Sequence, residues 1–414
     1  MNNYLSGIQF FGNIDPLELI QQFGSPIYVY SEAILRQRCR EIKNFMTFKH
    51  FDAHYSLKAN NNVELLKIIR EEGISSDAMS PGELFIAQKA GYTKDDILYV
   101  CNNVSAEEMI NAVDQGLVTS LDSLAQIETL GQVRPGSRIS IRFNPGIGAG
   151  HHEKVITAGK KTKFGVWHDQ IGDIKALLSQ YQLKLEGINM HIGSLFLEHS
   201  SYTKAAEELL KIAEEFEGLV FIDFGGGFGI PYQKHAQQGR LDLRETGKVL
   251  DQLVTQWSEK TGWKGTIVVE PGRYIAAECG VLLGTVHALK SQFDTNYAGT
   301  DLGFNVNPRP VLYDSYHELE IFGKNEKASQ ATEKVSVVGN ICESGDIVAK
   351  DRELPVIEQG DIIAMLDSGA YCFSMCSNYN ARLKPAEVLI QSDGTPRLIR
   401  RRDTLEDIMA QYRF

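Results

Sequence analysis

The sequence has no excess of basic residues and no long apolar run. Its 414 residues carry 53 acidic and 42 basic side chains, which gives a formal net charge of −11. A basic surface of the kind that binds DNA or RNA is therefore not expected. No apolar stretch reaches the roughly 18 residues of a transmembrane helix, and the first residues, MNNYLSGIQFFGN, lack the features of a signal peptide. We expect a cytoplasmic protein with no nucleic-acid or membrane partner.

Cysteine is also scarce, and no two cysteines form a C-x-x-C pair. Neither a disulfide framework nor a zinc site is expected from such scattered residues, so we expect reduced thiols. The adjacent His151 and His152 lack the carboxylate and thiol spacings of a metal site, and we expect no metal. The six cysteines are Cys39, Cys101, Cys279, Cys342, Cys372 and Cys376.

What the sequence does contain is typical of a globular protein, with 43% hydrophobic and 23% charged residues. Its length suggests two or three domains. Short apolar runs alternate with amphipathic stretches from about residue 50 to 270, and eight such units favour a closed (β/α)8 TIM barrel over an open doubly wound sheet. Ser80 and Ser105, each followed three residues later by Glu, predict helix starts. The expected strands are 52–57, 74–77, 97–100, 117–121, 138–143, 185–191, 219–224 and 266–270.

The pattern changes after Arg273. Apolar runs separated by turn residues predict a second, mostly antiparallel all-β domain. The first residues, with a short helix at 16–23 and a strand at 26–30, are expected to join it. We therefore predict a barrel at 31–273 and a β domain made of 1–30 plus 274–414. The expected strands of its later part are 281–288, 335–341, 361–366 and 386–390, followed by a helix at 403–411.

Reactive groups in a TIM barrel lie where the strands end, and the first expected strand ends at Lys58. This lysine is either an ordinary surface ammonium or, if partly desolvated in the barrel mouth, a nucleophile that forms a Schiff base with a carbonyl. Taken alone, the residue leaves both interpretations open, with the surface ammonium favoured.

The seventh expected strand runs into the glycine-rich segment Asp223–Gly229. Its three consecutive glycines, Gly225, Gly226 and Gly227, would let backbone N–H groups approach a phosphate closely. A simple turn between a strand and a helix is the alternative. The spacing is neither a dinucleotide fingerprint nor a P-loop, so a nucleotide site is disfavoured.

Two further strand ends carry polar groups, His191 with Ser194, and Glu270 with Arg273. A lone histidine is more often a core residue, and a carboxylate near an arginine is more often an ion pair. Together with Lys58 and the glycines, however, these groups are what a pyridoxal phosphate site needs. The imidazole can stack on the ring, and the carboxylate can keep the pyridine nitrogen protonated.

The sequence resembles the fold-type III pyridoxal-phosphate decarboxylases, which include the ornithine, arginine and diaminopimelate decarboxylases. The resemblance spans nearly the whole chain, and the segments 307–313, 342–346 and 380–388 look most like the diaminopimelate branch. It implies decarboxylation of meso-2,6-diaminopimelate to L-lysine and CO2. The shared motifs are Y-S-L-K-A-N at 55–60, H-I-G-S at 191–194, G-G-G-F-G at 225–229, E-P-G-R at 270–273, C-E-S-G-D at 342–346 and G-A-Y at 369–371.

Residue roles follow from the resemblance. It makes Lys58 the Schiff-base lysine, His191 the stacking residue and Cys342 the acid that reprotonates the α-carbon. It also implies a homodimer with active sites shared between chains. The implied cofactor ligands are Lys58, Asp77, His191, Ser194, Gly225, Gly226, Gly227, Glu270, Gly272, Arg273 and Tyr371. The implied substrate ligands are Arg273, Arg309, Tyr313, Glu343 and Tyr371.

The sequence departs from the family pattern at two places. Leu195 stands where the family commonly has glutamine, and the stretch 148–154 is divergent. Either could change the substrate pocket. The alternatives are therefore a decarboxylase of another amino acid or of a carrier-bound acyl group, a racemase, and a non-catalytic homologue. Lys58 and Cys342 are both present, which argues against the last of these.

Overall fold

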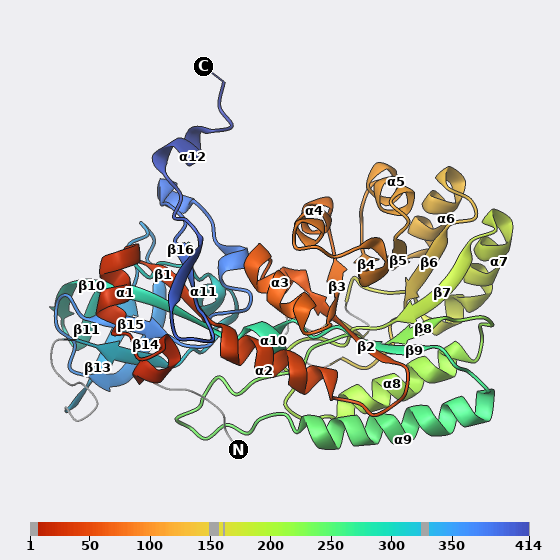
Figure 1. Cartoon of the computed structure of the whole chain (residues 1–414), viewed down its shortest axis with the longest axis horizontal. Helices are drawn as coiled ribbons and strands as arrows, with labels where there is room; N and C mark the ends of the chain where they lie inside the picture. The colour runs from red at the N-terminus through yellow and green to blue at the C-terminus, as the bar shows by residue number, and fades with distance from the viewer. Residues whose placement is uncertain (1–6, 149–156, 160–161, 324–330, 414) are drawn as a thin grey trace. The chain divides into compact units, whose positions relative to one another are not determined.

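A computed structural model describes residues 7–148, 157–159, 162–323 and 331–413. The chain forms two compact units. The barrel unit comprises residues 37–230 and 239–275, and the β unit comprises 1–36, 231–238 and 276–414. The short segment 231–238, which follows the glycine-rich loop of the barrel, thus packs with the β unit. Figure 1 labels the elements of both units.

The barrel unit is a closed barrel of eight parallel strands in sequence order, β2 to β9. Each strand lies within two residues of the range expected from the sequence. The expected (β/α)8 fold is therefore confirmed. The strands are β2 (Phe51–Ser56), β3 (Ser75–Ala78), β4 (Ile97–Val100), β5 (Val118–Leu121), β6 (Arg138–Arg142), β7 (Lys184–Asn189), β8 (Phe221–Asp223) and β9 (Thr266–Val269).

Helices alternate with these strands along the chain. Many begin at a side chain that accepts a backbone N–H of the first turn, and Ser80 and Ser105 do so for the N–H groups of Glu83 and Glu108. The expected helix starts at these two serines are confirmed. The helices are α3 (Val63–Glu71), α4 (Pro81–Lys89), α5 (Ala106–Asp114), α6 (Leu124–Val133), α7 (Ile171–Tyr181), α8 (Ser200–Ala213) and α9 (Leu243–Thr261). Two more, α2 (Glu32–Lys43) and α10 (Arg273–Ala276), lie where the chain passes between the units.

The β unit is built on a nine-stranded, mostly antiparallel sheet with the order β14-β13-β11-β10-β1-β16-β17, and β15 pairs with β10 and β12. The strand β1, from near the start of the chain, lies between β10 and β16. The expected second all-β architecture is confirmed. The strands are β1 (Ile27–Ser31), β10 (Gly280–Gln292), β11 (Thr295–Thr300), β12 (Leu319–Phe322), β13 (Thr332–Val338), β14 (Ile347–Pro355), β15 (Ile362–Met365), β16 (Ala386–Ile390) and β17 (Pro396–Arg400). Its helices are α1 (Pro16–Phe23), α11 (Arg309–Tyr313) and α12 (Leu405–Met409).

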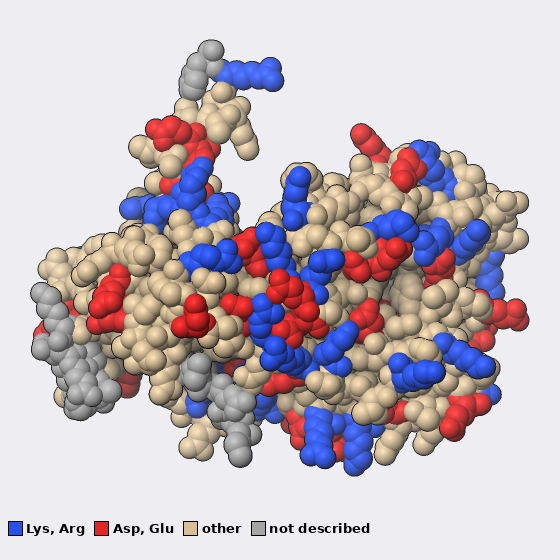
Figure 2. Space-filling view, in the orientation of Figure 1, with Lys and Arg blue, Asp and Glu red and all other residues tan. Residues whose placement is uncertain are grey.

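Charged side chains are spread over the surface. Figure 2 shows lysine and arginine intermixed with aspartate and glutamate on the face drawn. Across the residues that the structure describes, none of the helices is both long and apolar enough to cross a membrane.

Candidate active site

Five neighbouring strands of the barrel carry the candidate cofactor residues. In the closed barrel the order β3-β2-β9-β8-β7 is continuous. Asp77 lies in β3, and Lys58 lies in the turn Leu57–Ala59 directly after β2. Glu270 follows β9, and His191 follows β7. Because the ends of adjacent parallel strands meet at one edge, these side chains gather on one side of the barrel mouth.

Three buried carboxyl groups lie under this mouth. Burial, and next the charge of Asp223, raise the pKa of Glu270 to about 8. Burial is also the largest cause that raises the pKa of Asp77 and that of Asp223 to about 7 each. The Lys58 ammonium acts against the shifts of Asp77 and Glu270. A cation or an N–H donor bound beside these groups would favour their ionised forms.

The imidazole of His191 is fixed by a backbone bond. The N–H of Gly226 donates to His191 Nδ1 at 3.1 Å, and the same Nδ1 lies 3.9 Å from Glu270 Oε2. Burial, and next the charge of Lys58, lowers the pKa of His191 well below its ordinary value. The ring is therefore neutral, with Nδ1 unprotonated and its flat face available for stacking.

The glycine-rich segment after β8 leaves no room for side chains. A Cβ on Gly225 would meet Met190 O at 2.1 Å, and one on Gly226 would meet Glu270 O at 1.9 Å. Gly227 has a φ of +105°, a conformation that favours glycine. Glycine is thus required here by close backbone packing, at the place where the sequence predicts a phosphate nest. In this structure the N–H groups of Gly225 and Gly226 donate to Asp223 and His191.

Next to this nest, Arg273 Nη2 donates a hydrogen bond to Ser194 Oγ at 2.9 Å. Arg273 begins α10, and Gly272 lies in the bend just before it. Leu195, the departure from the family pattern, has a φ of +67°, which a branched side chain rarely adopts. The strained backbone is therefore located beside the predicted phosphate ligand Ser194.

These residues fit pyridoxal phosphate on two structural observations. Glu270 is 3% exposed, and its Oε1 accepts no hydrogen bond from any residue that the structure describes. A buried carboxylate oxygen in this state requires a donor, which a protonated pyridine nitrogen would be. The second observation is the pair formed by Arg273 and Ser194 beside the glycine loop, which would offer a guanidinium group and a hydroxyl to the phosphate. Lys58, which would supply the amine, follows β2, the strand that pairs with β9.

The β unit carries the residues implied for substrate binding on three segments. Cys342 and Glu343 lie on an exposed loop whose base is held by Asp346, since the N–H groups of Ile341 and Phe304 each donate to its carboxylate at 2.7 Å. The Cys342 N–H donates to Asn380 Oδ1 at 2.8 Å. Hydrogen bonds to Asp346 and Asn380 therefore hold the loop in place.

The hydroxyl group of Tyr379 holds Glu343, the other functional side chain of this loop. Tyr379 donates its hydroxyl hydrogen to Glu343 Oε1 at 2.6 Å, and this bond raises the pKa of Tyr379. None of the six cysteines, all of which the structure describes, is in a disulfide, and Cys342 is the exposed one among them. A thiol and a carboxylate are therefore presented together at the surface of the β unit.

The other two segments carry Arg309 with Tyr313, and Tyr371. Arg309 begins α11, is 2% exposed, and donates from Nη2 to Ser315 Oγ at 3.2 Å. Tyr313 ends the same helix. Tyr371 lies after β15 and has a φ of +58°. A strained backbone of this kind persists only where the surrounding structure imposes it, which is common at functional sites.

The sequence analysis missed three polar residues of the barrel mouth. Asp223 accepts the Gly225 N–H at 2.7 Å, and Ser56 donates its hydroxyl hydrogen to Asp77 Oδ2 at 2.6 Å. Arg142, at the end of β6, is buried and acts on Glu270 and Asp223 through its charge. The position of each at a strand end was the available signal. The divergent stretch at 148–154 lies outside the described residues except for Gly148, and so do His151 and His152.

Comparisons with known proteins agree with this geometry. A family model described as "Pyridoxal-dependent decarboxylase, pyridoxal binding domain" matches residues 32–277. A diaminopimelate decarboxylase of Methanothermobacter thermautotrophicus is 39% identical over 407 residues, which cover 96% of this chain and 94% of the relative.

Solved structures are similar over the same length. A crystal structure of a diaminopimelate decarboxylase has a TM-score of 0.89 and 31% identity, and covers 95% of each chain. The diaminopimelate decarboxylase of Helicobacter pylori complexed with L-lysine has a TM-score of 0.87 and 30% identity, with coverage of 95% of this chain and 98% of that one.

Proposed function

The chain belongs to the diaminopimelate decarboxylase family of pyridoxal-dependent decarboxylases, and from this premise we propose that it converts meso-2,6-diaminopimelate to L-lysine and CO2. The observation that supports this most strongly is the similarity at 39% identity over 96% of the chain. The family resemblance and the pyridoxal phosphate cofactor inferred from the motifs are confirmed by the family match. A related protein that binds L-lysine, the product proposed here, adds support.

The barrel residues would hold and orient the cofactor. Lys58 is the amine that would attach it, and Glu270 would hold the proton on its ring nitrogen. His191, kept neutral by burial, would cover the ring face, while the glycine nest and Ser194 would bind the phosphate. The bound cofactor supplies an electron sink for the pair released when CO2 leaves. The protein's own residues would contribute mainly by binding and orienting the substrate.

The β-unit residues would grip the far end of the substrate. Diaminopimelate carries an ammonium and a carboxylate there, and Arg309 and Glu343 have the complementary charges. Tyr313, Tyr371 and Arg273 are proposed to contact the substrate as well, with Tyr371 also reaching the phosphate. Cys342 is proposed to return a proton to the α-carbon, because a free thiol can donate a proton near neutral pH.

We also propose that the enzyme is a homodimer in which each active site takes residues from both chains. The cofactor residues lie in the barrel unit, whereas Cys342 and Glu343 lie in the β unit with exposed side chains. In a shared site these two side chains must reach the barrel of the other chain, so they must be exposed in the single chain.

A cytoplasmic location is proposed as well. None of the six cysteines, all of them described, is in a disulfide, and scattered thiols of this kind are usual in a reducing compartment. Cell fractionation with an antibody against the chain would test this, and recovery of the protein outside the cytoplasmic fraction would contradict it.

The substrate is tested by direct assay. Purified protein with pyridoxal phosphate is incubated separately with meso-diaminopimelate, ornithine, arginine and lysine, and the CO2 and amine product are measured. We expect CO2 and L-lysine from meso-diaminopimelate alone. Turnover of ornithine or arginine instead would favour a different decarboxylase, and a change in stereochemistry without CO2 would favour a racemase.

A further inference from the structure

A cleft of about 490 Å³ lies within the β unit, and none of the residues assigned above to cofactor or substrate lines it. It is lined by Ser25 and Pro26, just before β1, and by Ala381, Arg382 and Leu383 at the end of the turn Tyr379–Ala381. Asn340, which also lines it, precedes the loop that carries Cys342 and Glu343. The polar residues that line it are His287, Asp301, Asn305, Asn340, Arg382 and Arg402.

Two of these residues are arginines without a carboxylate partner. Arg402 Nη2 donates to the carbonyl of Pro26 at 2.6 Å, and Arg382 Nη2 donates to the carbonyl of Asn340 at 3.0 Å. Among the described residues, no carboxylate oxygen lies within ion-pairing distance of either guanidinium. Burial also lowers the pKa of Arg402, which indicates a charge that has lost part of its hydration.

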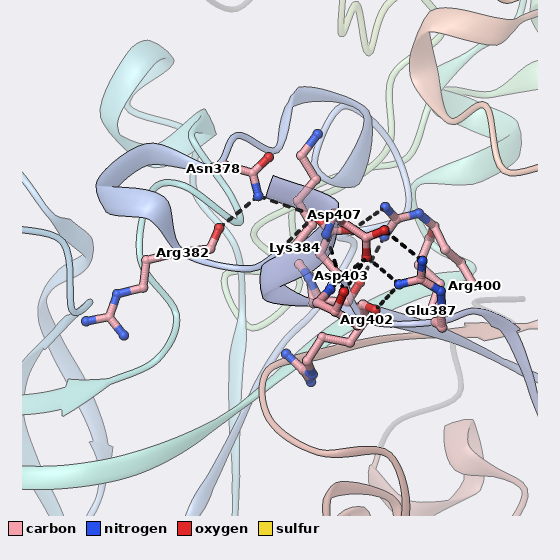
Figure 3. Close-up of polar contacts among 11 residues, drawn as sticks. Asn378, Arg382, Lys384, Glu387, Arg400, Arg402, Asp403 and Asp407 are labelled. Carbon is pink, nitrogen blue, oxygen red and sulfur yellow. Dashed lines mark hydrogen bonds and ion pairs between the residues drawn. The ribbon is translucent and has the colours of Figure 1, made fainter. Parts of the chain in front are cut away.

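The two arginines that precede Arg402 in the sequence each have a carboxylate partner. Arg400 pairs with Asp403 at 2.9 Å, and Arg401 pairs with Asp407 through a two-pronged contact. Figure 3 shows Arg400 beside Asp403 and Asp407, with the side chain of Arg382 directed away from both carboxylates. In a chain with a net charge of −11, two unpaired guanidinium groups in one cleft indicate a place kept for an anion.

Asp301 also lines the cleft and acts on Arg402 through its charge, but among the described residues it forms no ion pair with either arginine. Both oxygens of Asp301 are in use, since Oδ1 accepts the Thr285 N–H at 2.9 Å and Oδ2 lies 3.2 Å from His287 Nε2. Asn305 is 3% exposed, and its Oδ1 has no donor among the described residues. The ligand that suits the cleft thus carries anionic oxygens for the arginines and an O–H or N–H for Asn305.

We propose that this cleft is a binding site for a small anion, which Arg382 and Arg402 hold by a carboxylate or phosphate group. The paired charge-assisted hydrogen bonds of two guanidinium groups give such a ligand both affinity and orientation. The site shares no lining residue with the proposed substrate site, although Asn340 lies two residues before Cys342, and its occupation does not depend on the proposed decarboxylation.

Isothermal titration calorimetry of the full chain loaded with pyridoxal phosphate tests this proposal. Inorganic phosphate and glycolate, a carboxylate that also carries a hydroxyl group, are titrated separately at low ionic strength, so that the two anionic groups are distinguished. We expect one site per chain for at least one of them. Arg382→Met and Arg402→Met should each weaken binding at least about tenfold, because each removes charge-assisted bonds.

Arg397→Met is the matched control, because it removes one charge from an exposed residue of the same unit outside the cleft, and it should leave the affinity unchanged. Arg382→Lys, which keeps the charge, should bind more tightly than Arg382→Met. Circular dichroism verifies the fold of each variant. The proposal is overturned if neither anion binds the wild type, if Arg397→Met weakens binding as much as the cleft variants do, or if the cleft variants change only the dimer dissociation constant. That last result would make the acidic side chain of a second copy the occupant.

Discussion

His191 Nδ1 accepts the backbone N–H of Gly226 at 3.1 Å, so the ring proposed to stack on the cofactor and the glycine nest proposed to bind its phosphate are one hydrogen-bonded unit. The bond requires Nδ1 to be unprotonated, which agrees with the strongly lowered pKa of this buried histidine. A movement of the ring would therefore disturb the nest as well. The cofactor would find its ring support and its phosphate support already aligned.

Two variants of His191 separate stacking from hydrogen bonding. His191→Phe keeps a flat ring but leaves the Gly226 N–H without its acceptor, whereas His191→Leu removes both features. We expect the dissociation constant for pyridoxal phosphate to rise about tenfold in the Phe variant and further in the Leu variant. Absorbance titration measures it. Wild-type affinity in the Leu variant would show that the ring does not support the cofactor.

Lys58 is expected to carry the covalent link to the cofactor. Its turn follows β2 directly, and its charge acts on Asp77 and Glu270 across the mouth. The purified enzyme should show the visible absorbance of a protonated Schiff base, and borohydride reduction followed by peptide mapping should place the label on Lys58. The control Lys67→Ala changes an exposed lysine paired with Glu64 and should label like the wild type. A label on any other lysine contradicts the assignment.

Glu270 should make the cofactor-free protein less stable as the pH rises. Its pKa is raised on folding from 4.5 to about 8, first by burial and then by the charge of Asp223. A carboxyl group with a raised pKa gives its full contribution below pH 4.5, and that contribution is lost as the pH rises through about 8. Asp77 and Asp223 shift in the same direction, to about 7.

The comparison with Glu270→Gln isolates this effect. Between pH 5 and 8 the free energy of unfolding of the wild type should fall by about 1.4 kcal/mol per pH unit relative to the variant. Urea unfolding without cofactor at several pH values measures the difference. Stability curves that stay parallel across this window would show that Glu270 is already ionised in the folded protein.

The barrel strands could be predicted from the sequence because parallel strands covered on both faces are apolar throughout. All four residues of β4 are buried, and so are the last three of the four residues of β9. The strands β11, β12, β14 and β17 escaped prediction for the opposite reason. None of these four strands has more than two consecutive buried residues, so their sequence pattern resembles that of loops.

For the candidate site, the sequence predicts which reactive residues are present, but not their burial or their neighbours. Lys58, His191 and Glu270 carry recognisable motifs, but the raised pKa of Glu270 depends on burial beside Asp223, which adjacent strands bring together. Asp223 was read as part of a glycine-rich turn, although its carboxylate accepts the Gly225 N–H. Arg382 and Arg402 stand 20 residues apart, and no local pattern places them in one cleft.

Shared active sites predict complementation between inactive variants. Lys58→Ala removes the cofactor amine, and Cys342→Ala removes the exposed thiol of the β unit. If each site uses a barrel from one chain and a β unit from the other, a mixed dimer contains one site with both residues intact. Mixing the variants should restore up to about half of the activity per heterodimer relative to the wild-type dimer.

Subunit exchange must be demonstrated in the same sample, for example by native mass spectrometry of differently tagged chains. Activity that stays absent in mixed dimers would mean that each site is built from one chain. A mass of a single chain at assay concentration would contradict the homodimer itself.

The last prediction concerns the choice of substrate by Arg309. Replacing Arg309 with Met keeps much of the side-chain volume in a position that is 2% exposed, but it removes the charge proposed to hold the distal carboxylate. That carboxylate would then be buried without a partner, and its loss of hydration adds to the loss of the bond. We expect kcat/KM for meso-diaminopimelate to fall at least about 100-fold, an effect of about 3 kcal/mol. Discrimination against lysine, which lacks this carboxylate, should also fall.

Ser315→Ala is the matched control, because it removes only the partner of Arg309 Nη2 at 3.2 Å and should lower kcat/KM far less. The visible absorbance of the bound cofactor should persist in both variants, since Arg309 is assigned to the substrate. Wild-type kcat/KM in an Arg309→Met enzyme with intact cofactor binding would move the recognition of the distal carboxylate to another residue and favour a decarboxylase of a different amino acid.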